Sequence, residues 1–264
     1  MQSLSQDRSL RYGRSLFGER LLGRPAARLI AIDVARGVAI AGVVLFHVVW
    51  DLAYTGLTAP DLASHPAWVA FARTLAGSFM VLVGVSLVLA HQDAVHWARF
   101  AKRLLVIVLA ALAISIVTRI AFPERFIYFG ILHAIAVGSV VGILFLRLPA
   151  AIVAAAGAII FILPDYFSST VFDIRPLAWI GFSVQPPPSN DFVPVFPWVG
   201  LTLLGLAAAK IAIANSVDQW LARHQPGGMM ATTFTWMGCH SLAIYLIHQP
   251  VLLGILVPLA AWLR

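Results

Sequence analysis

Four ionisable side chains lie along one apolar stretch near the start of the chain: Asp33, Arg36, His47 and Asp51. On an α-helix at 100° per residue, Arg36 and His47 differ by about 20° around the axis, and both aspartates lie about 60° from Arg36. All four therefore share an arc of about 60°. Arg36 and His47 are about 16 Å apart along the axis, at 1.5 Å per residue.

His47 is the best candidate for acid–base chemistry in this stripe, because the unperturbed pKa of imidazole straddles neutral pH. Asp51 lies one helical turn further on, and we expect it to accept a hydrogen bond from one ring nitrogen of His47. The other nitrogen would then remain basic toward a substrate hydroxyl or amine. Hydrolases and acyltransferases use this arrangement of a base and an orienting carboxylate, here without a Ser or Cys nucleophile nearby in sequence.

Such groups are costly in lipid, about 2.5–3.5 kcal/mol for each Arg or Asp at mid-membrane, so they should face the protein interior or a wet cavity. One alternative places Asp33 and Arg36 at the membrane interface and makes His47 a neutral partner in one interhelical hydrogen bond. Four such groups on one stripe favour the lining of a path between the two faces. A small proton-coupled transporter or flippase could also use the Arg36–His47–Asp51 stripe, although the sequence has no evident inverted repeat.

The elements that must position these residues are membrane helices. Hydrophobic residues make up 61% of the 264 residues and charged residues 11%, against roughly 45–50% and about 25% in a soluble domain. We expect an all-α integral membrane bundle of about seven transmembrane helices. The apolar runs lie at about 34–54, 68–90, 103–122, 127–146, 149–163, 195–214 and 236–262. Residues 1–28 are expected to form a basic cytoplasmic tail, and residues 29–264 one membrane domain.

The distribution of basic residues predicts the orientation of the bundle. The predicted cytoplasmic side carries Arg8, Arg11, Arg14, Arg20, Arg24, Arg28, Arg99, Lys102, Arg103, Arg147, Lys210 and Arg223, against Arg119, Arg125, Arg175 and Arg264 on the other. This bias predicts a cytoplasmic N-terminus. The net charge of +7 favours binding to a membrane surface or to an anionic cofactor over binding to nucleic acid.

A metal site is not expected. The single cysteine, Cys239, excludes a multi-cysteine site and an internal disulfide, and the histidines lack the spacing of HxxxH or HExxH. In the last apolar run, Ser241, Tyr245 and His248 share a face of about 60°. Pro250 leaves the carbonyl of Leu246 without a helical partner, which is a local break where polar groups gather.

Five blocks of the sequence resemble, in the same order, motifs of the heparan-alpha-glucosaminide N-acetyltransferase catalytic-domain family. They are residues 32–39 (IDVARGVA), 45–52 (LFHVVWDL), 128–135 (YFGILHAI), 192–198 (FVPVFPW) and 238–250 (GCHSLAIYLIHQP). The resemblance covers most of the chain. The spacing of Arg36 and His47 is also similar to that of the integral-membrane O-acyltransferases that decorate bacterial glycans.

The resemblance implies a membrane-bound acyltransferase with acetyl-CoA as the cytoplasmic donor and a glycan or lipid-linked acceptor at or across the membrane. By position, His47 matches the first-span motif histidine and Arg36 its partner; with Asp33, Arg36 is the candidate donor-binding group. The candidate substrate-binding residues are His133, Trp198, Ser241, Tyr245 and His248. His47, with Asp51, would act as general base on the acceptor or be acylated first. We expect the protein in the inner membrane of a bacterium, with its acceptor, acyl chain length and oligomeric state left open.

Overall fold

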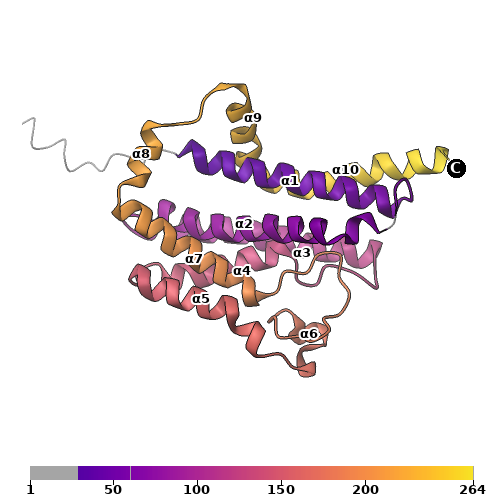
Figure 1. Ribbon diagram of the computed structural model, residues 1–264, viewed down its shortest axis with the longest axis horizontal. Helices are drawn as coiled ribbons and strands as arrows, with labels where there is room; N and C mark the ends of the chain where they lie inside the picture. Colours follow the sequence, from indigo (N-terminus) through magenta and orange to yellow (C-terminus); the bar gives the residue numbers. More distant parts are fainter. Residues whose placement is uncertain (1–28, 60, 264) are drawn as a thin grey trace, which may run out of the picture.

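The computed structural model describes residues 29–59 and 61–263, and over these ranges the chain forms helices joined by turns and loops, with no strand (Figure 1). One isolated bridge pairs Phe129 with Phe192. The long helices are α1 (Ile30–Tyr54), α2 (Pro66–Ala90), α3 (Trp97–Ala121), α7 (Val195–Ala214) and α10 (Ser241–Trp262). The shorter ones are α4 (Ile131–Phe145), α5 (Ala150–Tyr166), α6 (Arg175–Ala178), α8 (Val217–Arg223) and α9 (Gly228–Cys239), besides two 3₁₀ turns at Leu62–Ser64 and Thr170–Phe172.

The all-helical prediction is confirmed for the described part of the chain. Five helices are long and apolar enough to cross a membrane, namely α1, α2, α3, α7 and α10. The helices α4 and α5 are apolar but only 15 and 17 residues long, at or below the short limit of about 17 residues for a span. Seven spans therefore remain a prediction, as does the orientation. The expected basic tail, residues 1–28, lies outside the described residues.

The last apolar run is not one continuous helix. The expected span at 236–262 is divided at His240, where α9 ends and α10 begins. The two helices pack differently: α9 lies against the first half of α1, and α10 continues along its second half. Gly238 approaches the carbonyl of Asp33 so closely that a Cβ atom there would lie 1.9 Å from the oxygen, and the change in direction follows directly after this contact.

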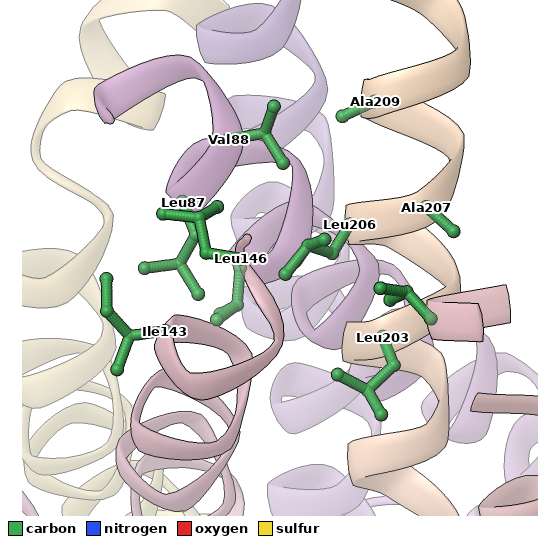
Figure 2. Close-up of a cluster of buried hydrophobic side chains, with 10 residues drawn as sticks. Leu87, Val88, Ile143, Leu146, Leu203, Leu206, Ala207 and Ala209 are labelled. Atoms are coloured by element: carbon green, nitrogen blue, oxygen red, sulfur yellow. The ribbon is translucent and has the colours of Figure 1, made fainter. Parts of the chain in front are cut away.

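The core of the bundle lies where α2, α4 and α7 meet, and α5 covers the other side of α7. Figure 2 shows its buried side chains, among them Leu87 from α2, Ile143 from α4 and Leu206 from α7. The backbones of α2 and α7 come close at Gly84, where a Cβ atom would lie 2.0 Å from the carbonyl oxygen of Thr202. On the opposite side of α2, α1 packs against α2, α9 and α10. The stripe of α1 that carries Asp33, Arg36, His47 and Asp51 therefore lies between two layers of helices.

Candidate active site

A cavity of about 1010 Å³ lies between α1, α2, α3, α4 and α10. Its lining includes Arg36 near the first turn of α1 and Trp50 near the last. These residues are about 21 Å apart along the helix, so the cavity follows α1 over most of a membrane thickness. Its wall is apolar over most of its length, with polar groups concentrated at the two ends and around one histidine in between.

One end of the cavity is strongly basic. Arg36 of α1 and three residues of the first turns of α3, Arg99, Lys102 and Arg103, all line it. The Arg36 guanidinium donates to the carboxylate of Asp33 at 3.0 Å and to the hydroxyl of Ser86 at 3.0 Å. Asp33 offers one carboxylate against four cations, so this end attracts a multiply charged anion.

His47 lies in the middle of the cavity, as its helical angle to Arg36 predicts. Its Nδ1 lies 2.9 Å from the carbonyl oxygen of Val43, one turn back on α1. Because a carbonyl can only accept, Nδ1 carries the proton in the neutral ring. Nε2 is then left with a lone pair, which is the basic form of imidazole that proton abstraction requires.

A second imidazole lies beside His47. The rings of His47 and His248 are 4.6 Å apart between centroids, edge to face at 74°. Nδ1 of His248 lies 2.7 Å from the carbonyl oxygen of Tyr245, so this ring too carries its proton on Nδ1. Its Nε2 is buried without a hydrogen-bond partner. The expectation that His248 belongs to the site agrees with this position, although it stands behind His47 and does not itself line the cavity.

Asp51 has a different partner from the one we expected. Its side chain is fully buried and accepts a hydrogen bond from the amide Nε2 of Gln249 on α10, at 2.7 Å. The predicted hydrogen bond to His47 is replaced, because Nδ1 of His47 is already held by the carbonyl of Val43 in its own helix. Asp51 Oδ2 and Gln249 Oε1 are both buried without a hydrogen-bond partner. Asp51 therefore ties α1 to α10 rather than orienting the imidazole.

The end of the cavity away from the cations carries an acidic group that sequence reasoning missed. Asp191, in the loop before α7, lines the cavity and accepts hydrogen bonds from the backbone N–H of Ile131 at 2.8 Å and the hydroxyl of Tyr245 at 3.3 Å. Burial raises the pKa of Asp191, and these two hydrogen bonds partly oppose that shift. Its signal in the sequence was its position directly before the matched block at 192–198.

The remaining candidates divide between the cavity and the packing around it. Ser241 and Tyr245 line the cavity. His133 does not; its Nδ1 accepts from the N–H of Gly130 at 3.2 Å and its Nε2 lies 3.3 Å from Ser115 Oγ, so it holds the start of α4 against α3. Trp198 packs against a buried cluster of α2 and α4, away from the lining. Within the ranges described, no group of three His, Cys, Asp or Glu residues could hold a metal ion.

Apolar helices of membrane-spanning length around an internal cavity are typical of a membrane-embedded binding protein or enzyme. The imidazole of His47 in the cavity lining, with His248 behind it, favours an enzyme. The chain belongs to the family described as heparan-alpha-glucosaminide N-acetyltransferase, catalytic, whose model matches residues 28–250. This confirms the resemblance found in the sequence, and the family is one of transmembrane acetyltransferases. Searches of curated proteins and of solved structures found no match.

Proposed function

We propose that this protein transfers an acetyl group from acetyl-CoA, bound at the basic end of the cavity, to a glycan or lipid-linked sugar bound at the other end. The observation that carries the proposal is the continuity of the cavity, which joins four cations, the imidazole of His47 and the carboxylate of Asp191. Family membership supports an acetyl donor and a glycan acceptor in general terms.

The basic end suits coenzyme A, whose phosphates are multiply charged anions that Arg and Lys bind through charge-assisted hydrogen bonds. The apolar stretch between Arg103 and His47 would shield the pantetheine arm and the thioester from water. Arg99, Lys102 and Arg103 belong to the side of the predicted bundle that carries the excess of basic residues. This excess supports a cytoplasmic position for this end of the cavity. The donor would then enter from the cytoplasm.

In the proposed reaction, the acceptor hydroxyl or amine attacks the thioester carbonyl while Nε2 of His47 takes its proton. The carbon–sulfur bond breaks, coenzyme A leaves as its thiolate, and the proton on His47 is finally released to the thiolate or to water. The ring of His248 lies beside that of His47, and its Nε2 has no hydrogen-bond partner. In the proposed mechanism this lone pair accepts a hydrogen bond from protonated His47. A route through acetylated His47 would use the same two nitrogens.

At the acceptor end, side-chain oxygens that can accept hydrogen bonds line the cavity. Gln249 lines this end and its Oε1 lacks a partner, and Asp191 faces the same cavity. Groups of this kind bind the hydroxyl and amine donors of a sugar. This arrangement favours acyl transfer over the transporter alternative, since a proton relay would need no donor-binding end with four cations.

The direct test of the function is incubation of the purified protein with acetyl-CoA labelled in its acetyl group and with a cell-envelope extract. We expect label to appear in an envelope glycan or glycolipid together with free coenzyme A. Binding of acetyl-CoA without transfer to any envelope fraction would contradict the enzyme assignment. If the protein did not bind acetyl-CoA at all, the result would favour the transporter alternative.

Replacing Arg36 with alanine is expected to weaken coenzyme A binding by roughly ten- to a hundredfold, because a hydrogen bond to a charged group contributes about 1.5–3 kcal/mol. Isothermal titration calorimetry of the purified variant measures this directly. Lys102→Ala should weaken binding in the same direction, and it removes no hydrogen bond within the described residues. Arg223→Ala, on exposed α8 and away from the cavity, is the matched control and should bind like the wild type. Unchanged affinity in both Arg36→Ala and Lys102→Ala would remove this end from the donor site.

A further inference from the structure

The cavity reaches the lipid-facing surface of the bundle along α3. Val117 lines the cavity, yet 60% of its surface is exposed, and the neighbouring lining residues Ala113 and Ala121 are exposed as well. Their spacing of four residues places the three on one face of α3. Since α3 is a candidate membrane span, a surface exposed on this face contacts lipid. The cavity is therefore open to the bilayer over about 12 Å of α3.

The helices that frame this opening are α3 and α10, which pack on different neighbours. The main packing partner of α3 is α4, whereas α10 packs on α1 and α9. Nearer the basic end, Leu242 and Leu246 of α10 pack against a buried cluster that includes Ala111 of α3 and close the gap. Nearer the other end, the lining residues include Pro250 and Leu253 on α10 and Val117 and Ala121 on α3.

This opening lies beside the end of the cavity that holds Asp191 and Gln249, and away from the four cations. A molecule that entered from the bilayer would therefore meet hydrogen-bond acceptors with its head and leave its tail among Val117, Pro250 and Leu253. Apolar side chains at this depth cannot form hydrogen bonds with a polar glycan chain, whereas they pack well against hydrocarbon.

We propose that the acceptor is a lipid-linked sugar that enters sideways from the bilayer between α3 and α10, with its hydrocarbon chain held in this portal. The portal is defined by Ala113, Val117, Ala121, Pro250 and Leu253. The inference rests on the proposed acetyltransferase function and names its acceptor class. The sugar head reaches Gln249 and Asp191, and the lipid chain never leaves the membrane.

The structure offers two adjacent positions that separate the portal from the ordinary lipid-facing surface. Val117 lines the cavity, whereas Ile116 is 62% exposed and does not. Tryptophan at position 117 would fill the portal, and tryptophan at position 116 would extend into lipid. Both variants place a tryptophan on the same turn of α3, so a difference between them reports on the portal and not on membrane insertion.

The experiment compares dodecyl glucosaminide with methyl glucosaminide as acceptors for the nanodisc-embedded protein, with coenzyme A release as the readout. The wild type and Ile116→Trp should prefer the dodecyl acceptor in kcat/KM. Val117→Trp should lose about tenfold of that preference, equivalent to the loss of contact with roughly two methylene groups. Equal preference in all three proteins would overturn the portal, because membrane partitioning of the dodecyl chain is the same in each.

A second readout does not require turnover. Dodecyl glucosaminide with a diazirine at the end of its chain should label the portal residues saturably, and unlabelled dodecyl glucosaminide should compete while methyl glucosaminide should not. Even, non-saturable labelling of all lipid-facing residues would overturn the inference. Saturable labelling of a protein that neither binds nor consumes acetyl-CoA would instead remove the proposed function and leave the portal standing.

Discussion

Replacing His47 with alanine is expected to reduce acetyl transfer by about 10²–10⁴-fold, the usual effect of losing a general base. The reason is geometric: Nδ1 of His47 is held by the Val43 carbonyl at 2.9 Å, and Nε2 is left free to take a proton inside the cavity. The measurement is the rate of coenzyme A release from acetyl-CoA with a saturating acceptor. Coenzyme A binding and the melting temperature should stay close to those of the wild type, since the side chain lost is small and neutral.

Two companion variants make this result specific. His248→Ala should reduce turnover about ten- to a hundredfold, the effect of losing one hydrogen bond to a charged group, and His248→Gln should recover part of it by offering an amide oxygen. His224→Ala, on the exposed end of α8, should have no effect. If His47→Ala kept more than about a tenth of wild-type turnover, it would lie outside the range for a general base, and His47 would not be the base.

The positions of Arg36 and His47 on the cavity were predictable from sequence, because both lie on one helix and the geometry of a helix fixes the angle between its residues. The same holds for Ser241 and Tyr245 on α10. Within one helix, spacing alone determines which side chains face the same way. Whether that face lines a cavity followed from the cost of charge in lipid.

The contacts between helices were not predictable in this way. Asp51 pairs with Gln249, which lies 198 positions further along the chain, and Asp191 binds Tyr245 across 54 positions. No periodicity within one segment specifies such a partner, so the expected hydrogen bond between Asp51 and His47 was wrong. For the same reason, nothing in the sequence indicated that His133 would hold the start of α4 and so turn away from the cavity.

The break at His240 was hidden because the segments on both sides of it are predominantly apolar. Apolar runs locate lipid-facing or buried segments, but they do not reveal a change of direction within one run. The close contact of Gly238 with the backbone of Asp33 is a tertiary feature. Small residues at helix contacts were recognisable as packing positions, and the partner of each became known only from the structure.

Glycine-mediated packing gives the second prediction with a large effect: Gly84→Leu should abolish the folded bundle. Gly84 is buried in α2, and a Cβ atom there would lie 2.0 Å from the carbonyl oxygen of Thr202 and 2.6 Å from the backbone nitrogen of Leu206. Both obstacles are backbone atoms of α7, which cannot rotate away as a side chain can. Overpacking of a core typically costs about 1–3 kcal/mol, and a clash with a neighbouring helix backbone lies at or beyond the upper end of this range.

The matched control is Gly254→Leu, the same substitution at a helical glycine of α10 that has no atom within 4 Å of its added Cβ. Size-exclusion chromatography in detergent and a thermal melt followed by tryptophan fluorescence measure the outcome. We expect Gly254→Leu to elute and melt like the wild type and Gly84→Leu to aggregate or be lost during purification. A Gly84→Leu protein that eluted as a single species and melted within a few degrees of the control would show that α2 and α7 are not packed at this distance. Because α2 also supplies the Ser86 hydroxyl that holds Arg36, that result would contradict the described geometry of the donor end of the cavity as well as that of the core.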